Sequence, residues 1–533
     1  MLNTIKKKHY FHQVVPVVTF AAVTGVLTSV VVNLYKLCAK WAVVFSERGY
    51  HQLRERWFLI PVALVFMFVV AWLLARVYRN NVNLCGGGIP TSIGALRGLF
   101  PFGWLKNTAG VFILSLISFL LGVPLGSEGP SVQMGTALGR GSVYTITKKR
   151  RAWDRYAMTG GACAGFSVAT GAPVSGILFA VEEAHQRVSP MILMAASTAV
   201  MFAHLTTELL APVLGVSVSL FPSVHISRLS LSRIWIPIVI AVVFGLFSVL
   251  FLFYYRVIRH IVNDKLKSAG HRYILFAIFV LTLIAGLFSL SFISTGHELI
   301  LELFEASPAV YMLLLMLFVR CTLTFCANTG RMTGGIFLPI LAIGAVLSAL
   351  IAKAIEIIPG VGGDYYGVIL ALGITACISG MMKMPLTATA FALEALGCSS
   401  NVLYVIVVAA VTFAITEIFD AKSINDVVLE NRMETMHEEK TCKVIDTYVT
   451  VQADAFAAGK HIRDIFWPAN LLVLSVQHAR SQDSLVDEQG GRALCAGDVL
   501  HVRYTTYHDE QSREELLAIV GEQEYQSKEA DAI

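Results

Sequence analysis

A single carboxylate within an apolar stretch is the most informative chemical group of this sequence. Glu128 lies in the segment 126–130 (GSEGP), and long apolar segments flank it. A charged side chain inside a bilayer costs about 2.5 to 3.5 kcal/mol or more and is functional by default. When ionised, such a carboxylate can occupy the same set of backbone amides as a small anion. Protonation releases it, so proton uptake and anion occupancy become mutually exclusive.

The residues around Glu128 predict a helix that begins at this point. Proline at a first helical position costs no hydrogen bond, and glycine lets the backbone expose its amides. The unpaired N–H groups of a first turn, with the positive end of the helix dipole, attract an anion. No lysine accompanies them, which suits passage of an anion better than tight binding. A purely structural alternative is that Glu128 caps its own helix.

Two other segments offer the same arrangement, namely residues 86–90 (GGGIP) and 335–339 (GIFLP). Glutamates also end an apolar stretch at Glu182 and Glu183, where they fit either ordinary interfacial charges or a functional pair. His297 next to Glu298 is a possible metal pair, but no HExxH motif and no second histidine at ligand spacing accompany it. We therefore expect neither a metal nor a cofactor, and no protease activity.

The elements that must position these groups are membrane helices. Of the 533 residues, 56% are hydrophobic and 14% are charged, against about 25% charged in a soluble domain. Crossing a bilayer takes about 20 apolar residues, and a first such run extends from Val14 past Val32 without a signal-peptide cleavage site. Further runs are residues 57–75, 105–125, 232–257, 272–293, 309–326 and 400–418.

Charge and cysteine usage narrow the possibilities further. Basic clusters at residues 6–8 and 148–151 predict that both segments, and both chain ends, are cytoplasmic. The net charge of +5 requires no nucleic-acid partner. Nine cysteines are scattered without a CxxC pair, which indicates neither a disulfide framework nor a zinc site.

Glycine and proline interrupt many apolar stretches, at residues 86–90, 126–130, 160–173, 330–339 and 383–385. Interrupted helices survive in hydrocarbon only where protein buries them or where they line a wet cavity. Two of the interruptions form a repeat, because GSEGP matches GIFLP, and GAPVSGILFAVE (171–182) matches KMPLTATAFALE (383–394). The sequence therefore predicts a duplicated membrane domain with its site where the repeats meet.

The apolar character stops near Glu417, which places a domain boundary between residues 420 and 442. We assign residues 1–435 to the membrane domain and 440–525 to a small soluble α+β domain. Residues 443–452, 471–477 and 499–504 have the β-branched alternation of strands, whereas 461–466 and 511–520 are typical of helices.

These motifs and their order resemble those of the CLC family of chloride channels and chloride/proton antiporters, over roughly residues 10–432. The family carries a GSGIP-like element, a G-K/R-E-G-P element and G-x-F-x-P, which appear here as GGGIP, GSEGP and GIFLP. The resemblance implies an all-α membrane fold of about 18 helices in two inverted halves. It also implies a homodimer in which each subunit has its own pore.

By this resemblance, Glu128 is the gating glutamate and Glu183 is the internal proton-transfer glutamate of the antiporters. The backbone amides of Ile336 and Phe337 are the expected central anion ligands. The complete predicted set of anion ligands is Gly87, Gly88, Ser127, Gly129, Ile336, Phe337, Leu338 and Asn425.

The sequence departs from the family pattern at two anion ligands. Gly87 stands where the family usually has a serine, and Asn425 is the best match for the usual tyrosine. Losing both hydroxyls leaves the central site less well defined, with room for a larger anion such as nitrate. The intact GIFLP segment argues against the fluoride-exporting branch.

The tail resembles the C-terminal regulatory domain of potassium-uptake proteins, called TrkA-C or RCK-C, through residues 459–463, 469–476 and 497–500. Such domains dimerise and can bind a small ligand, although a structural dimer clamp is an alternative. Together the resemblances imply a bacterial plasma-membrane anion/proton antiporter. The alternatives are an uncoupled anion channel and a ligand sensor that has lost transport.

Overall fold

The computed structural model describes residues 2–148, 152–221, 224, 226–358, 365–437, 442–468, 470–478, 493–521 and 526–529. Of the predicted basic cluster at residues 148–151, only Lys148 belongs to the described residues. The side chains of Lys6, Lys7 and Lys8 are likewise outside the description, although their backbone belongs to the first helix.

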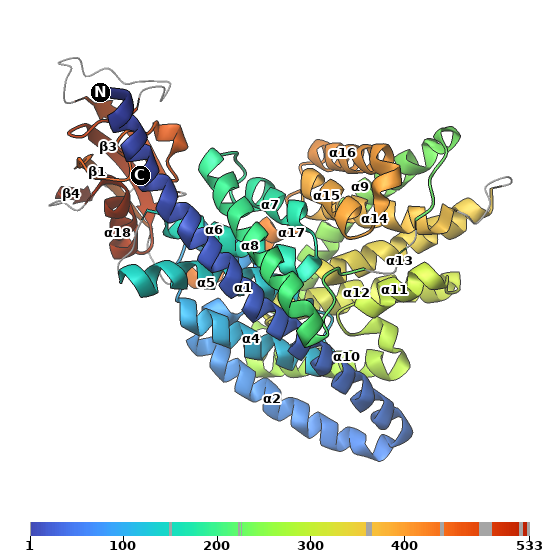
Figure 1. Ribbon diagram of the computed structural model, residues 1–533. Helices are drawn as coiled ribbons and strands as arrows, with labels where there is room; N and C mark the ends of the chain where they lie inside the picture. Colours follow the sequence, from blue (N-terminus) through green and yellow to red (C-terminus); the bar gives the residue numbers. More distant parts are fainter. Residues whose placement is uncertain are drawn as a thin grey trace.

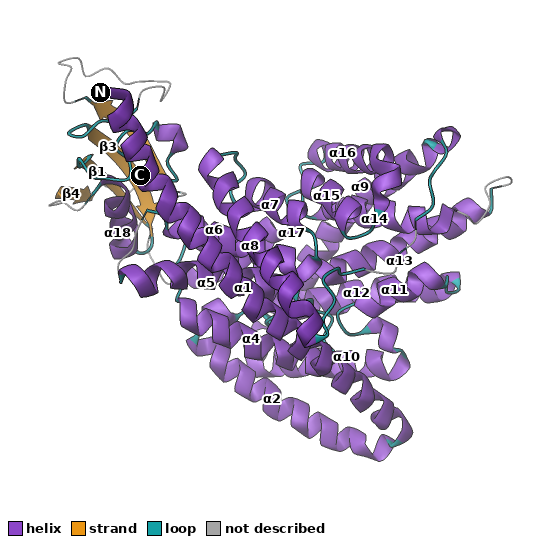
Figure 2. Cartoon of the chain, in the orientation of Figure 1, coloured by secondary structure: helices purple, strands orange, loops and turns teal. Residues whose placement is uncertain are grey.

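Helices make up nearly all of the chain before residue 440 (Figures 1 and 2). Those of the first half are α1 (Leu2–Glu55), α2 (Ile60–Asn80), α3 (Ile89–Leu96), α4 (Trp104–Leu120), α5 (Glu128–Thr147), α6 (Asp154–Thr170), α7 (Pro173–Phe179) and α8 (Pro190–Leu214). Those of the second half are α9 (Trp235–Arg259), α10 (His271–Phe288), α11 (His297–Glu305), α12 (Val310–Thr329), α13 (Phe337–Glu356), α14 (Tyr366–Met381), α15 (Pro385–Glu394), α16 (Val402–Ile418) and α17 (Ile424–His437).

Eight helical segments of the described chain are long and apolar enough to cross a membrane. Six of them correspond to runs expected from the sequence. The other two, Pro190–Leu214 and Phe337–Glu356, were not expected as long runs. Alanine and polar residues dilute the apolar character of the first, whereas the second is as apolar as the expected spans but follows a glycine and proline interruption. In the second of these, 83% of the most apolar window is buried inside the protein.

Short helices confirm the prediction of interrupted spans. The eight residues of α3 extend about 12 Å, well short of a hydrocarbon layer of about 30 Å. All eight are buried. Helices α7 and α15 are similarly short, with 7 and 10 residues. Protein therefore surrounds α3 completely, which is the setting in which free backbone groups are tolerated, whereas the first turns of α7 and α15 are partly exposed.

The predicted interruption at residues 160–173 is wrong at its start. Helix α6 runs unbroken from Asp154 to Thr170, and only residues 171–172 separate it from α7. The glycines of α6 serve helix packing instead, since a Cβ on Gly161 would lie 2.0 Å from the carbonyl oxygen of Gly135 in α5. Small residues at such contacts let two membrane helices approach closely.

The C-terminal part forms a four-stranded antiparallel sheet in the order β2-β3-β1-β4, at one end of the molecule (Figure 2). Its strands are β1 (Lys443–Thr450), β2 (Leu471–Gln477), β3 (Val499–Thr506) and β4 (Gln526–Glu529), and one helix, α18 (Asp509–Val520), packs with it. Strand β4 pairs with β1 although it lies beyond the predicted domain limit of residue 525.

One predicted helix of this part is wrong. Residues 461–466 contain only a single 3₁₀ turn, Ile462–Asp464, and the backbone is extended again at Ile465. Pro468 follows soon after, and the residue before a proline avoids the helical region. The indole N–H of Trp467 instead donates a hydrogen bond to the carbonyl oxygen of Ile462 at 3.0 Å.

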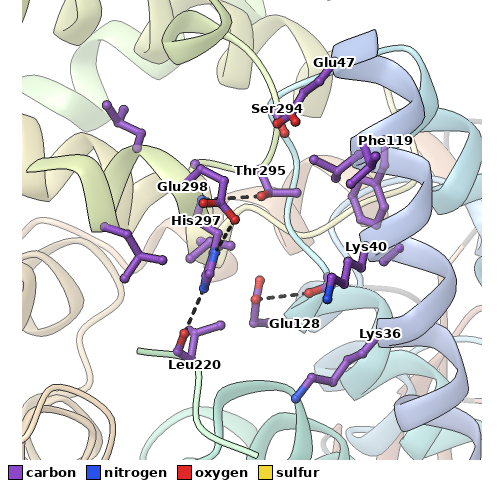
Figure 3. A pocket seen from close by; sticks show the side chains of 18 of the residues that line it. Lys36, Lys40, Glu47, Phe119, Glu128, Leu220, Ser294, Thr295, His297 and Glu298 are labelled. Carbon is purple, nitrogen blue, oxygen red and sulfur yellow. Dashed lines mark hydrogen bonds and ion pairs between the residues drawn. The ribbon is translucent and has the colours of Figure 1, made fainter. Parts of the chain in front are cut away.

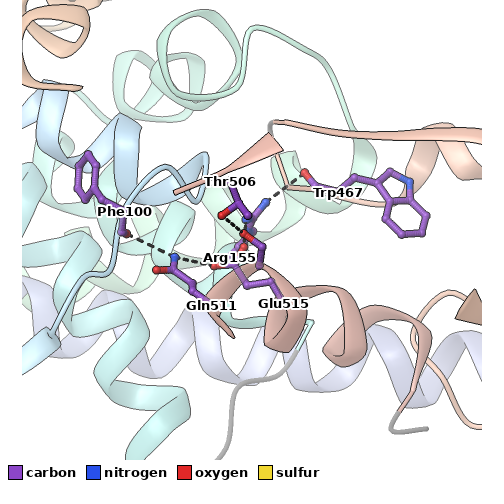
Figure 4. Close-up of polar contacts among 7 residues, drawn as sticks. Phe100, Arg155, Trp467, Thr506, Gln511 and Glu515 are labelled. Atoms are coloured by element: carbon purple, nitrogen blue, oxygen red, sulfur yellow. Dashed lines mark hydrogen bonds and ion pairs between the residues drawn. The ribbon is translucent and has the colours of Figure 1, made fainter. Parts of the chain in front are cut away.

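A buried ion pair fastens this sheet domain to the helical part (Figure 4). Arg155, in the first turn of α6, pairs with Glu515 of α18 and donates to the carbonyl oxygen of Trp467 at 3.1 Å. The Arg155 and Glu515 side chains are only 10% and 14% exposed. Phe466 packs edge-on to His185, with ring centroids 4.4 Å apart. The sheet domain thus rests against the segment that follows Glu183.

Candidate functional site

The three glycine segments singled out in the sequence meet in the structure. Gly126 and Gly335 form an antiparallel bridge, with N···O distances of 2.6 and 2.8 Å in the two directions. Gly86 accepts a hydrogen bond from the amide of Gly334 at 3.4 Å, which joins the third segment to the other two. Gly126 and Gly335 are also equivalent positions of the predicted repeat. The two halves therefore touch at matching residues.

Glycine is required where these segments cross. Gly88 has a φ of +76°, and a Cβ there would lie 2.2 Å from the carbonyl carbon of Gly129. A Cβ on Gly129 would in turn lie 2.2 Å from the carbonyl oxygen of Gly87 and 2.7 Å from the Cα of Gly335. The backbones are in direct contact, so side chains at these positions would force them apart.

Each segment ends in a helix whose first turn points toward this crossing. Helix α3 begins at Ile89, α5 at Glu128 and α13 at Phe337. The prolines therefore occupy the second or third helical position rather than the first, which corrects the sequence-based placement. The cost is still nil, because the first four N–H groups of a helix lack an intrahelical partner.

Glu128 is the first residue of α5, and its side chain is fully buried. The hydroxyl of Ser127 donates to its Oε1 at 3.2 Å, whereas Oε2 has no hydrogen-bond partner in the described part of the chain. A Cβ on Gly126 would meet both this Oε2, at 2.5 Å, and the Cβ of Leu338, at 3.0 Å. The carboxylate therefore points toward the start of α13 and away from lipid.

Glu128 borders a cavity of about 620 Å³ (Figure 3). The second half of α1 and the residues before α11 line the rest of this cavity. Lys36 and Lys40 line one wall, and His297 lines the other. Lys36 donates to the carbonyl oxygens of Val168 and Ser217 at 3.1 and 2.9 Å. Glu47, Glu298 and Glu302 line it as well, so groups of both signs border the approach to the buried carboxylate.

His297 is held by hydrogen bonds rather than arranged as a metal ligand. Its Nε2 lies 2.8 Å from the carbonyl oxygen of Leu220, and its Nδ1 lies 3.3 Å from the Glu298 carboxylate. Among the described residues, no group of three or more histidines, cysteines or acidic side chains is arranged to hold a metal ion.

The adjacent glutamates at the end of α7 have different surroundings. Both lie in a π-helical turn, Ala180–Ala184, and such turns are frequent at functional sites. Glu182 binds the first-turn amides of α15, at 2.8 and 2.7 Å, so its carboxylate is committed to a helix cap. Glu183 points inward and is 3% exposed. Glu182 therefore caps a helix, whereas the Glu183 carboxylate is enclosed by protein.

Asn425 lies in the first turn of α17 and is fully buried. Its backbone N–H donates to the Ser423 hydroxyl at 3.3 Å. Its side-chain carboxamide lies against Glu183. Arg97 completes the surroundings, because it donates to the carbonyl oxygen of Glu183 at 3.4 Å and pairs with Asp426 at 3.6 Å. The structure thus brings this predicted anion ligand next to the inner glutamate.

Two residues near the first glycine segment escaped the sequence analysis. Arg432 of α17 donates to the carbonyl oxygen of Cys85 at 2.8 Å and to the Thr91 hydroxyl at 2.5 Å, and so spans the segment GGGIP from both sides. Asn328, near the end of α12, is 6% exposed and faces Gly87. A polar or charged residue within or after an apolar run was the available signal, but many such residues only satisfy local bonds.

The fold and the buried carboxylate define a polytopic membrane protein with a titratable side chain enclosed where its two halves meet. The family model "Voltage gated chloride channel" matches residues 63–417, and the chain belongs to this family.

Curated relatives include the H(+)/Cl(-) exchange transporter ClcA of Klebsiella pneumoniae, 25% identical over 439 residues, which cover 80% of this chain and 91% of the relative. The ClcA of Salmonella arizonae is 26% identical over 443 residues with the same coverage of 80% and 91%.

Solved structures share the fold. A slow cyanobacterial Cl⁻/H⁺ antiporter superposes with a TM-score of 0.70 at 22% identity and covers 79% of this chain and 99% of its own. A CLC-type fluoride/proton antiporter gives a TM-score of 0.62 at 18% identity, with coverages of 77% and 97%.

Proposed function

We propose that this protein exchanges chloride or a similar small anion for protons across a membrane. The supporting observation is the position of Glu128, which is buried at the start of α5 and directed toward the start of α13. Relatives that cover most of the chain carry the name H(+)/Cl(-) exchange transporter. A titratable group beside free helix amides is the arrangement that such an exchange needs.

The proposed mechanism is a competition for backbone amides. Ionised Glu128 occupies the N–H groups at the start of α13 and excludes an anion from them. Protonation from the cavity side removes the negative charge, and the amides become free for the anion. The expected ligands are backbone groups of Gly87, Gly88, Ser127, Gly129, Ile336, Phe337 and Leu338, with the Asn425 carboxamide as a side-chain donor.

Glu183 is the proposed proton carrier on the opposite side of the site. It is buried, and its neighbours Arg97 and Asp426 line, together with Lys383, a cavity of about 1010 Å³. Protons and anions would then share one path at Glu128. Between Glu128 and the Glu183 side of the protein, they would follow separate paths. This division lets each ion reach the same compartment without passing through the other's binding groups.

Proton-coupled flux in liposomes tests the proposal. A chloride gradient imposed on the reconstituted protein should drive protons against their own gradient, and Glu128→Gln should abolish the proton component while chloride still moves. Chloride flux without proton flux in the parent protein would instead identify an uncoupled channel.

A ligand sensor without transport is the alternative from another functional class. It predicts no anion flux from the full chain or from a chain ending before residue 440. Flux from either form would exclude a sensor, and the buried, titratable arrangement at Glu128 favours that outcome.

The sheet domain, residues 440–525 and the adjoining β4, is proposed to be a cytosolic regulatory module of the TrkA-C type that binds a small ligand. Its position then makes both chain ends cytoplasmic in a bacterial plasma membrane, within a homodimer. Protease protection of the sheet domain in right-side-out vesicles tests the orientation, and cross-linking in native membranes tests the dimer.

A further inference from the structure

The space beside Gly87 is a small cavity with a polar wall. Its volume is about 60 Å³, and the start of α3, the middle of α17 and the ends of α9 and α12 enclose it. A single water needs roughly 10 to 15 Å³ of such volume, so a small anion fits, with or without water. Its polar lining includes Thr91, Tyr255, Asn328, Arg331 and Arg432.

One amide donor in this lining has no partner. Asn328 is 6% exposed, and its Nδ2 makes no hydrogen bond within the described part of the chain. The Tyr255 hydroxyl donates to Asn328 Oδ1 at 2.9 Å, which fixes the carboxamide with Nδ2 turned away from the tyrosine. A buried donor left without an acceptor is costly, and a bound acceptor would remove that cost.

The free donor faces the position where Gly87 lacks a side chain. A Cβ on Gly87 would lie 3.4 Å from Asn328 Nδ2, so the carboxamide borders the space that a larger residue would fill. The guanidinium of Arg432 lines the same cavity, and its Nε is also buried without a partner. Donors and positive charge therefore converge, and this set fits a small monovalent anion rather than a cation.

We infer that Asn328 supplies the side-chain hydrogen bond that selects the transported anion beside Gly87, and that Tyr255 positions it. This inference rests on the proposed anion transport, because the ligand is the same ion. The neutral amide binds an anion without holding it as strongly as a lysine would, and the glycine leaves room for the amide to approach. Asn328 is then a specificity-determining residue contributed by α12.

Chloride binding and anion preference of the purified full-length protein test this inference. Asn328→Ala should weaken chloride binding, measured by calorimetry, by roughly tenfold or more, as expected for losing a hydrogen bond to a charged group. Asn328→Asp should weaken it further, because a carboxylate repels the anion. Tyr255→Phe should change the relative fluxes of chloride and nitrate in liposomes while the protein remains folded.

A rescue variant separates a ligand role from a packing role. The nearest atoms to a Cβ on Gly87 lie at 3.4 to 3.8 Å, so a serine fits there. Adding Gly87→Ser to Asn328→Ala should restore chloride binding, since its hydroxyl replaces the lost donor. Asn401→Ala is the matched control, because Asn401 is equally buried at 1% exposed but binds Leu229 and Ser227 instead.

The possible failures are distinguishable. A parent protein that neither binds nor moves chloride would overturn the proposed function. A parent that transports chloride, with the two Asn328 variants binding it as tightly and with the same anion preference, would overturn the role of Asn328 alone. Weakened binding in Asn328→Ala that Gly87→Ser does not restore would show packing rather than ligation, and would also reject the inference.

Discussion

Glu182 and Glu394 cap each other's helices across the two halves of the membrane domain. Glu182, at the end of the α7 turn, accepts hydrogen bonds from the first amides of α15 at 2.8 and 2.7 Å. Glu394, at the end of α15, accepts from the first amides of α7 at 2.8 and 3.0 Å. Each glutamate follows the first proline of its own helix by nine residues. The repeated sequence block is therefore a reciprocal pair of N-terminal caps.

This reciprocal capping predicts different phenotypes for variants of the neighbouring residues Glu182 and Glu183. Glu182→Gln should lower the free energy of unfolding by about 0.5 to 2 kcal/mol, because it removes a charged cap, and should leave proton coupling in place. Glu183→Gln should abolish proton flux with little change in stability. Thermal unfolding in detergent and proton flux in liposomes measure the two effects.

The exposed Glu430→Gln is a suitable control for that pair, since Glu430 only pairs with Lys422 on the surface. Loss of proton coupling in Glu182→Gln, with coupling retained in Glu183→Gln, would reverse our assignment of the two residues.

Gly129→Ala should prevent assembly of the site. Its Cβ would meet the backbone of Gly87 at 2.2 Å, and neither backbone can move without breaking the neighbouring bridge. We expect a loss of about 3 kcal/mol in stability, the upper end of the usual range for overpacking, together with loss of anion binding. Gly103→Ala has no atom within 4 Å of the added carbon and should be neutral. Size-exclusion profiles and chloride calorimetry compare the two, and normal chloride binding by Gly129→Ala would contradict the close crossing.

Arg155→Ala should release the sheet domain from α6. The variant removes the charged partner of Glu515, whose side chain is 14% exposed and still accepts a hydrogen bond from Gln511 Nε2 at 3.0 Å. The cost should therefore stay below the roughly 3 to 5 kcal/mol of a broken, fully buried pair. Hydrogen exchange should then rise in α18 and in the first turn of α6. As a control, Arg503→Ala removes an ion pair with Asp446 within the sheet, in which the Arg503 side chain is half exposed. Hydrogen exchange in α6 should not change in this variant. Unchanged exchange in Arg155→Ala would show that apolar contacts alone hold the domain.

Lys460 makes the stability of the sheet domain depend on pH. Burial lowers the pKa of Lys460 to about 7, and the opposing attraction of Asp464 is smaller. Its ammonium lies 2.9 Å from the centroid of the Phe456 ring. The unfolded chain, with a lysine pKa of 10.5, binds a proton that the folded chain lacks between pH 7 and 10.5. Stability should therefore rise with pH across this window.

Pulse proteolysis at several pH values within that window measures the effect. Lys460→Met should flatten the dependence and stabilise the domain at neutral pH, because the cost of burying a charge is gone. A parent domain that loses stability as the pH rises through this window would show that Lys460 stays charged when folded.

Much of the helical fold could be predicted from the sequence, because the signals were local. Apolar runs marked most spans, and glycine before proline marked the starts of α3, α5 and α13. The unbroken α6 was missed because its glycines serve packing against α5, and a glycine in the sequence does not reveal which role it has. The span Phe337–Glu356 was missed because its start doubles as an ion-site segment.

The sequence singled out the carboxylates and the backbone segments of the candidate site, but not its side-chain donors Asn328 and Tyr255. Glu128 stood out because an acid in an apolar segment needs a reason. Residue type and spacing did not separate Glu182 from Glu183, since only the turn of the helix decides which one faces α15, and the choice of Glu183 rested on the family resemblance. Asn328 and Tyr255 are 73 residues apart, and only the fold brings them together.

The bridge between Gly126 and Gly335 limits how the protein can cycle. A transporter that rocks one half against the other would have to break both hydrogen bonds of this seam, where no solvent could compensate. If the bridge persists through transport, the backbone acts as a fixed frame, and we expect access to alternate through local rotation of side chains such as Glu128. A covalent cross-link between the two halves near this bridge should therefore leave the transport rate unchanged. The same cross-link would stop a transporter that moves one half against the other.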